Sequence, residues 1–257
     1  MGPSAVRHAA SALAALFVLA IPPAAAADGP ACAARRFEDV DLTACVIRDV
    51  GAVRLFLNDG SGAPYGDFAA VAASLDDGER LALAMNAGMY HADRAPVGLY
   101  VENGERRQRL NENDGPGNFH MKPNGVFWIE ADGAGARARV GTPKTFKKAK
   151  GVRHATQSGP MLVIDGALHT RFIPGSDSLK RRNGVGVRAD GAVVFAVADA
   201  PINFDAFARF FRDEMKTPDT LFLDGSISRL YAPAIGRNDR GAKMGPIVGV
   251  VVADDAD

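Results

Sequence analysis

The chain is poor in cysteine and tryptophan, and it carries no excess of either charge. Two cysteines among 257 residues are too few for a disulfide scaffold. No C-x-x-C redox motif is present, and no Cys/His spacing suits a structural zinc site. Lysine plus arginine numbers 30, as does aspartate plus glutamate. This balance removes the positive surface expected of a general nucleic-acid binder, so no nucleic-acid partner is predicted.

Long apolar runs are equally scarce, because Ala9–Ile21 has no counterpart later in the chain. This run is too short to cross a hydrocarbon core about 30 Å thick as a helix. Arg7 precedes it, Pro22 ends it, and small residues follow, so residues 1–27 are predicted to be a secretory signal peptide. The alternative is an uncleaved membrane anchor. After cleavage no transmembrane segment is expected, and the protein is predicted to be periplasmic or secreted.

Both cysteines, Cys32 and Cys45, lie in the predicted mature chain. In an oxidising compartment a disulfide between them would link the new N-terminus to the first strand, and the alternative is two unrelated buried thiols. For a loop near this length, the chain-entropy estimate of the stabilisation is ~3 kcal/mol. Residues 28–257 are long enough for a full hydrophobic core and are predicted to form one domain.

Short apolar runs separated by turn residues predict a sheet-rich fold. Glycine makes up 28 of the 257 residues, more than the ~7% of an average chain, which is typical of many tight turns. Asn203 precedes the clearest helix, 204–215, and Asp67 precedes a shorter one. Strands are expected at 42–47, 53–57, 81–85, 97–101, 125–129, 161–164, 185–188, 193–198, 220–223 and 247–252. The predicted fold class is α+β, a single domain with a mixed or antiparallel sheet core and few helices.

Five polar, glycine-containing clusters lie at the ends of these strands. They occupy 85–90, 118–127, 155–162, 181–187 and 221–228. Taken singly, each cluster is compatible with turn chemistry, since Asn-Gly and Asp-Gly are common turn dipeptides. Five of them together instead predict one pocket on a rigid scaffold.

The clusters, in this order, resemble the phosphodiester glycosidase family, and in particular its bacterial exported branch. The resemblance covers about residues 85–250. Its most specific segments are 122–127, 182–186 and 223–228. An animal member removes N-acetylglucosamine from a sugar phosphodiester and has a run of glycines between its aspartate and serine, whereas here Asp224-Gly225 leads directly into Ser226. The resemblance implies a hydrolase that acts on a carbohydrate or sugar-phosphate substrate.

A sugar phosphodiester needs less acid catalysis than an ordinary glycoside, because its leaving group is a phosphate ester. One carboxylate with cationic and N–H groups then suffices. Asp224 is the candidate catalytic residue, as a base for water or as the nucleophile at the anomeric carbon, and an Asx-turn is its alternative role. Arg182 and Lys122 are candidate phosphate ligands, with a surface ion pair as the alternative for Arg182. The other candidate substrate- or phosphate-binding residues are Asn86, Asn124, Ser158, Asn183, Ser226 and Ser228.

The residues require neither a metal nor a cofactor, and neither is predicted. Asp199 and Asp224 would be the oxygen ligands of a divalent ion, and His91 and His120 are weaker candidates for a base. A Ser-His-Asp hydrolase is disfavoured because no G-x-S-x-G motif is present. Two other classes stay open, a non-catalytic binding module and an accessory module for anionic cell-envelope polysaccharide or exopolysaccharide. No oligomeric state is predicted.

Overall fold

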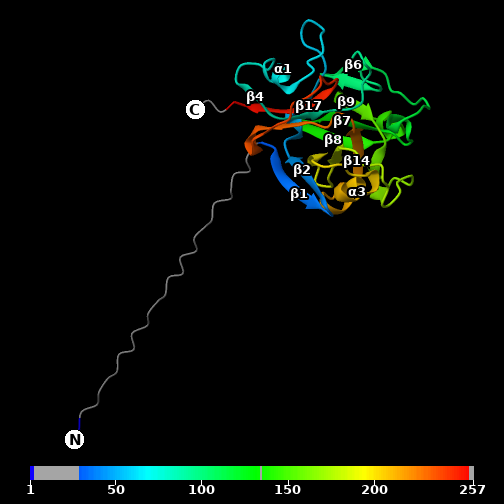
Figure 1. The fold of residues 1–257 in the computed structure, drawn as a ribbon. Coiled ribbons are helices and arrows are strands. Elements are labelled where there is room, and N and C mark those ends of the chain that lie inside the picture. Colours follow the sequence, from blue (N-terminus) through cyan, green and yellow to red (C-terminus); the bar gives the residue numbers. More distant parts are fainter. Residues whose placement is uncertain (3–28, 134, 255–257) are drawn as a thin grey trace.

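The computed structural model describes residues 1–2, 29–133 and 135–254 (Figure 1). Residues 3–27 of the predicted signal peptide therefore lie outside the described part of the chain. Antiparallel sheets make up most of the fold, and a few short helices lie around them. This arrangement confirms the predicted α+β class with a sheet core. Within the described ranges, no helix is long and apolar enough to cross a membrane.

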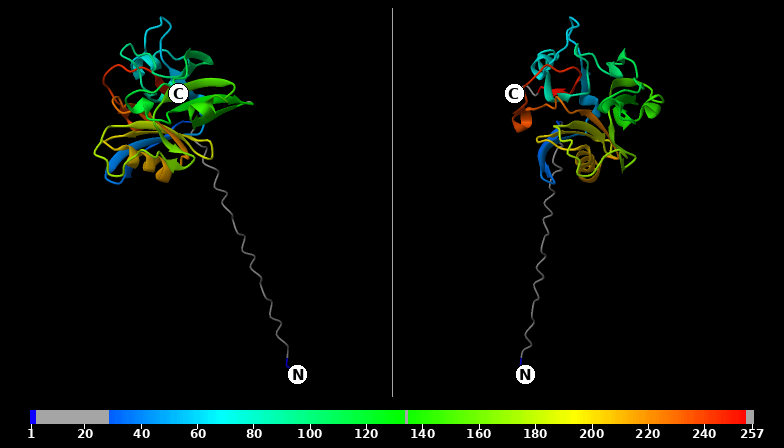
Figure 2. Two further views of the ribbon diagram at one scale, coloured as in Figure 1. Left: turned by 90° about the vertical axis from the view of Figure 1, so that its right-hand side faces the viewer. Right: turned by 45° about the vertical axis from the view of Figure 1, so that its right-hand side comes forward.

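The described strands form one seven-stranded sheet and two five-stranded sheets (Figures 1 and 2). Across the first sheet the order is β1 (Ala31–Phe37), β2 (Val40–Ile47), β13 (Val193–Ala198), β12 (Asn183–Val187), β14 (Asp219–Asp224), β10 (Met161–Ile164) and β11 (Ala167–Leu168). The second contains β16 (Arg237–Asn238), β15 (Leu230–Ala232), β4 (Glu79–Asn86), β17 (Ile247–Ala253) and β3 (Val53–Phe56). The third contains β6 (Glu105–Gln108), β5 (Tyr100–Glu102), β9 (Val152–Ser158), β7 (Gly125–Asp132) and β8 (Gly135–Gly141).

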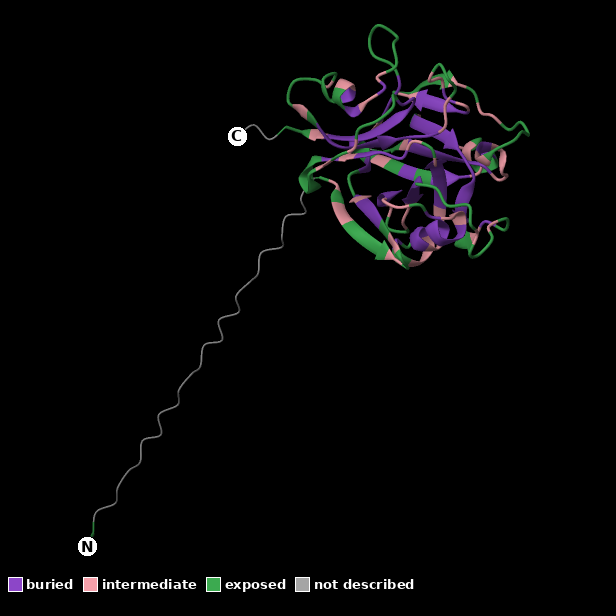
Figure 3. Cartoon of the chain, in the orientation of Figure 1, coloured by how far each residue is buried: buried purple, intermediate pink, exposed green. Residues whose placement is uncertain are grey.

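The inner faces of the three sheets share one main hydrophobic core. Leu83 of β4, Phe127 of β7 and Val185 of β12 each come from a different sheet and are all buried in it. Buried residues accordingly fill the centre of the molecule in Figure 3. Because protein cores are close-packed, a shared core holds the strand ends of the three sheets at fixed positions relative to one another.

The helix α3 (Phe204–Arg209) packs on the opposite face of the first sheet, over a second hydrophobic core. Asn203 caps it as predicted, since its Oδ1 accepts a hydrogen bond of 2.8 Å from the Ala206 N–H in the first turn. The chain then widens into a π-helical turn, Phe210–Glu214, so the predicted single helix is α-helical only in its first half. The wider turn allows the adjacent Phe210 and Phe211 both to be buried against the sheet.

Two further α-helices are shorter than one and a half turns. They are α1 (Phe68–Ala72) and α2 (Pro143–Phe146). Asp67 caps α1, since its Oδ1 accepts a hydrogen bond of 2.9 Å from the Ala70 N–H, and this confirms the predicted start of that helix. The helix ends before Leu75, the predicted end.

The N-terminal hairpin carries the predicted disulfide. β1 and β2 place Cys32 directly opposite Cys45, and the two sulfurs are bonded. The sequence pattern did not predict β1, because Ala31–Phe37 lacks regular alternation and most of its residues are exposed or half-buried. The disulfide therefore joins an edge strand to its neighbour in the first sheet.

β9 is an internal strand that the apolar pattern also missed. It lies between β5 and β7, yet it contains four buried polar residues. These are His154, Thr156, Gln157 and Ser158. Their polar atoms have partners: the Thr156 hydroxyl donates to the Ala87 carbonyl at 2.7 Å, and Gln157 Oε1 accepts from the Leu99 N–H at 2.9 Å. Buried polar groups are tolerated when they are hydrogen-bonded, so a hydropathy pattern does not mark such a strand.

Candidate functional site

Strand ends from the first two sheets meet at the candidate catalytic residue. Asn183, which begins β12, stands opposite Asp224, which ends β14. Asn183 Oδ1 accepts a hydrogen bond of 2.9 Å from the Asp224 N–H. Its Nδ2 donates to the carbonyl oxygen of Asn86 at 2.9 Å and to Asn86 Oδ1 at 3.0 Å. Because Asn86 ends β4 of the second sheet, this amide links the two sheets at Asp224.

The third sheet reaches the same place through Ser158 and Asn124. Ser158 ends β9, and its hydroxyl donates to the carbonyl oxygen of Leu223, the residue before Asp224, at 2.8 Å. Asn124 is fully buried directly before β7, and its Oδ1 has no partner among the described residues. Gly159 packs so closely on Asn124 that a Cβ there would lie 2.7 Å from the Asn124 Cβ. The structure thus brings Asn86, Asn183, Ser158 and Asn124 together around one strand end.

Asp224 is buried, with 7% of its surface exposed. Its Oδ1 accepts hydrogen bonds from the Ser226 N–H at 2.7 Å and the Ile227 N–H at 3.4 Å, so the Asx-turn geometry is present. Burial raises the pKa of this carboxyl, and the backbone N–H donors oppose the rise. A carboxylate of raised pKa is a stronger proton acceptor than an ordinary exposed carboxylate.

The two serines of the last cluster differ in what their side chains do. The Ser228 hydroxyl is buried and lies 3.2 Å from the carbonyl oxygens of Asp224 and Arg181, to which it donates. It therefore secures the turn after β14. Ser226 is exposed, and its contact with Asp224 is made by its backbone N–H.

Arg182 and Lys122 lie in different settings. Arg182 is 1% exposed, and it donates to the carbonyl oxygens of Ile202 at 2.8 Å and Ser178 at 2.9 Å. Its guanidinium carbon lies 3.6 Å from the centre of the Phe204 ring, burial lowers its pKa to about 10, and Nη1 has no described partner. It is thus no surface ion pair. The half-exposed Lys122 instead donates to a loop carbonyl oxygen, and no described contact joins it to Asp224.

Arg229 contacts this site through its backbone, and it is not among the candidate residues predicted from the sequence. The backbone N–H of Arg229 donates to Asn86 Oδ1 at 3.0 Å, the same oxygen that Asn183 contacts. The pKa of the phenol of Tyr90, which belongs to the cluster at 85–90, is raised by burial and by the Asp224 carboxylate, and the charges of Arg94 and Arg229 oppose this rise. The signal for Arg229 was a cationic residue directly after Ser228 at the start of an apolar strand.

The metal-ligand and histidine candidates are engaged elsewhere or exposed. The Asp199 carboxylate accepts hydrogen bonds from Thr43 and Arg237. His120 Nδ1 lies 2.9 Å from a loop carbonyl oxygen, and His91 is exposed. Among the described residues, no group of three or more histidines, cysteines or acidic residues is placed to hold a metal ion.

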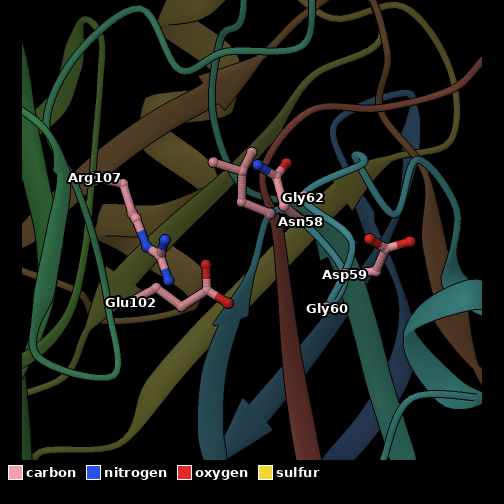
Figure 4. Close-up of a pocket in the computed structure, with 7 residues that line it drawn as sticks. Asn58, Asp59, Gly60, Gly62, Glu102 and Arg107 are labelled. Atoms are coloured by element: carbon pink, nitrogen blue, oxygen red, sulfur yellow. The ribbon is translucent and has the colours of Figure 1, made fainter.

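Two cavities open beside the loop at 57–62, and none of the candidate residues lines either of them. Their volumes are about 310 Å³ and 330 Å³. Glu102 and Arg107 lie side by side on the wall of the first (Figure 4). Burial raises the pKa of Glu102 to about 6. The candidate catalytic residue therefore belongs to a separate, buried polar cluster.

The fold places the chain in a class of α+β proteins of known structure. The catalytic domain of zebrafish N-acetylglucosamine-1-phosphodiester alpha-N-acetylglucosaminidase, auto-inhibited by its pro-peptide, matches with a TM-score of 0.60 and 13% identity, over 86% of this chain and 82% of that one. A putative exported protein of Burkholderia pseudomallei matches with a TM-score of 0.54 and 12% identity, over 82% of this chain and 74% of that one. At these identities the likeness shows a shared fold.

The sequence identifies the family within that class. The phosphodiester glycosidase family model matches residues 79–249, and the chain belongs to this family. An uncharacterised Escherichia coli protein, YigE, is 36% identical over 179 residues, which are 70% of this chain and 69% of the relative. The matched range includes every candidate residue from Asn86 to Ser228, and Arg229 as well.

Proposed function

We propose that this protein is an exported hydrolase that cleaves the glycosidic bond of a sugar-phosphate diester or a related envelope glycan. The observation that carries the proposal is the buried Asp224 carboxyl at the junction of the three sheets, in a chain of the phosphodiester glycosidase family. The name of the zebrafish structural match supports the same reaction class.

The proposed chemistry uses one carboxylate. The bond from the anomeric carbon to the phosphate oxygen breaks, and the phosphate ester leaves with the bonding electrons without first needing a proton. Asp224 accepts a proton from the attacking water, or attacks the anomeric carbon itself before water releases the sugar. The Asn183 amide accepts a hydrogen bond from the Asp224 N–H and so holds the backbone of Asp224 in place. Asn86 in turn accepts a hydrogen bond from Asn183 and fixes that amide. A buried arginine stabilises the charge on the phosphate, and the two buried arginines of this region are Arg182 and Arg229.

Release of sugar from an N-acetylglucosamine phosphodiester tests this proposal. The mature chain, Asp224→Asn and the control Asp77→Asn, which alters an exposed carboxylate, are compared. We expect Asp224→Asn to lower kcat by about 10²–10⁴-fold, since a general base or nucleophile is lost, and Asp77→Asn to match the parent. Equal release by parent and Asp224→Asn would remove Asp224 from its role. Binding of the sugar phosphate without release by the parent would favour the binding module.

Export is the second part of the proposal. The Cys32–Cys45 disulfide supports it, because such bonds persist in oxidising compartments. Fractionation of cells that produce the full chain, followed by mass measurement, should recover a periplasmic or secreted form that begins near Asp28. Recovery of the unprocessed chain in the cytoplasm, with free thiols, would refute export and leave the proposed reaction untouched.

A further inference from the structure

We propose that Arg229 holds the anionic group of the substrate, binding two phosphate oxygens along one edge of its guanidinium. This inference rests on the proposed function, since it assigns the phosphate end of the same site. No sequence motif or family match assigns this role to Arg229.

The first observation is a buried cation with unused donors. Arg229 is 7% exposed, and both Nε and Nη2 are buried without a partner among the described residues. These two nitrogens lie on the same edge of the guanidinium, the edge that binds two oxygens of a carboxylate or phosphate side by side. A buried donor without an acceptor is costly, so an edge kept free in this way fits a ligand that supplies both acceptors.

The acidic groups whose charges act on Arg229 are already occupied. Asp67 accepts hydrogen bonds from Lys243 at 2.6 Å and from the Ala70 N–H at 2.9 Å. Asp239 accepts from the Leu230 N–H at 3.0 Å and from Arg237 at 2.8 Å. The charges of both carboxylates act on Arg229, yet neither accepts a hydrogen bond from its Nε or Nη2 among the described residues. Burial lowers the pKa of Arg229, and the negative charges of Asp67 and Asp239 oppose this lowering while leaving Nε and Nη2 free.

Packing holds the Arg229 side chain in place. Its guanidinium carbon lies 5.3 Å from the centre of the Phe68 ring, a cation–π distance. Gly241 lies beside the side chain, since a Cβ on this glycine would be in van der Waals contact, at 3.4 Å, with Arg229 Cδ and Nη1. The φ of Gly241 is +155°, a conformation that favours glycine. A preorganised guanidinium loses less freedom when it binds an anion.

Arg229 is tied to Asp224 through a short chain of hydrogen bonds. The Arg229 N–H and Asn183 Nδ2 both contact Asn86 Oδ1, and Asn183 Oδ1 accepts from the Asp224 N–H. The charges of Arg229 and Asp224 both act on the Tyr90 phenol. This chain fixes the Arg229 backbone beside the strand end that carries Asp224, and in the proposed complex the anomeric carbon lies between the two side chains.

The other two cationic candidates are less suited to this task. Arg182 spends two of its nitrogens on the carbonyl oxygens of Ile202 and Ser178, so it offers one free nitrogen rather than a pair. Lys122 is a single-point donor that already contacts a loop carbonyl oxygen. Arg229 alone among the three keeps a complete two-nitrogen edge without a described partner.

Calorimetric binding to the mature chain tests the assignment without requiring turnover. The probes are inorganic phosphate, N-acetylglucosamine 1-phosphate, glucuronate and neutral N-acetylglucosamine. The variants are Arg229→Gln, Arg229→Lys and the control Arg240→Gln, which alters an exposed neighbour. We expect Arg229→Gln to weaken sugar-phosphate binding at least about 10-fold, and Arg240→Gln to bind as the parent does. Arg229→Lys should bind with intermediate affinity, because an ammonium group keeps the charge but lacks the paired edge of a guanidinium.

Neutral N-acetylglucosamine should bind all variants alike, and glucuronate binding stronger than phosphate binding would overturn the phosphate assignment. Unchanged phosphate affinity in Arg229→Gln, or no binding of any anionic probe by the parent, would overturn the proposal. If Arg229→Gln does not fold by circular dichroism, Arg229→Lys carries the comparison. Sugar release with an unchanged KM in Arg229→Gln would refute this assignment alone, whereas Arg229-dependent phosphate binding without release would refute the proposed hydrolysis alone.

Discussion

At Asp224, two influences act on a single proton. Burial raises the pKa of the carboxyl above its ordinary value of 3.8, and the backbone N–H groups of the following turn oppose the rise. Because a higher pKa keeps the carboxyl protonated to a higher pH, fewer molecules carry the reactive carboxylate in mild acid. We expect kcat/KM for the phosphodiester to rise with pH through the raised pKa, so that on acidification activity begins to fall before pH 3.8 is reached. A rate that is flat down to that pH would contradict Asp224 as the base or nucleophile.

Asn183 gives a second test at the residue scale. Asn183→Ala removes the acceptor of the Asp224 N–H and the donor to Asn86, so buried backbone and side-chain groups lose their partners. We expect the free energy of unfolding to fall by about 2 kcal/mol. Urea denaturation measures this, with the exposed Asn113→Ala as the control. Equal midpoints for Asn183→Ala and the parent would show that the amide does not hold the strand ends together.

The sequence predicted the polar cluster better than it predicted the cations around it. Asp224, Asn183 and Asn86 were recognisable because each ends or begins an apolar strand, and the structure joins them by hydrogen bonds. Arg229 was missed because its proposed role depends on two buried nitrogens, Nε and Nη2, that have no described partner. The spacing of residues in the sequence contains no information about such free donors. Lys122 was selected from its motif alone, and the structure gives its amine a loop carbonyl oxygen instead.

At the element scale, the β1–β2 hairpin depends on its disulfide. β1 is an edge strand whose residues are mostly exposed or half-buried, so little burial holds it against β2. Replacing both Cys32 and Cys45 with serine should lower the free energy of unfolding by ~3 kcal/mol, since the unfolded chain loses a cross-link. Denaturation of the parent with and without reductant gives the matched control. A double variant that is as stable as the oxidised parent would contradict this.

His154 of β9 makes an element-scale prediction about pH. Burial, followed by the charges of Arg153 and Arg54, lowers the pKa of His154 from 6.5 to about 4. The unfolded chain therefore binds a proton that the folded chain does not, and stability falls as the pH drops from 6.5 toward 4. Between pH 7 and pH 5 this group should cost about 2 kcal/mol of unfolding free energy.

A matched pair of variants isolates the His154 contribution. In His154→Asn the side-chain oxygen can replace Nδ1, which accepts from the Asn103 N–H at 3.4 Å, and it does not titrate. Denaturation midpoints of this variant should change less between pH 7 and pH 5 than those of the parent. His91→Asn, which alters an exposed histidine, should keep the full pH dependence. The same slope in the parent and in His154→Asn would remove His154 as its cause.

At the scale of the whole molecule, the sheets are built from segments that are distant in the sequence. β2 pairs with β13, and β3 and β4 both pair with β17. Local periodicity predicts that such strands exist, and it did so for most apolar ones, but it contains no information about which strand pairs with which. The α+β class was therefore predictable, whereas the meeting of three sheets at Asp224 had to come from the structure.

A cation bridges two of these sheets away from the main core. Arg237 of β16 in the second sheet donates to Asp199 and to the Thr43 hydroxyl of the first sheet, each at 2.6 Å, and it also contacts Asp239. Its side chain is 15% exposed, and those of Asp199 and Asp239 are 29% and 28% exposed. Removal of the guanidinium would leave two partly buried carboxylates without their cation.

Arg237→Gln should therefore lower the free energy of unfolding by about 2 kcal/mol, because the cost of the unpaired carboxylates exceeds that of a lost surface pair. The control is Arg36→Gln in the exposed pair with Asp41, where the expected change is ~0–1 kcal/mol. Urea denaturation followed by tryptophan fluorescence reports on the third sheet, where Trp128 lies. If the shared core makes the sheets unfold together, the fluorescence of Trp128 will also report the loss of stability that Arg237→Gln causes in the second sheet. An unchanged Trp128 transition with a shifted circular dichroism transition would instead show that the sheets unfold independently.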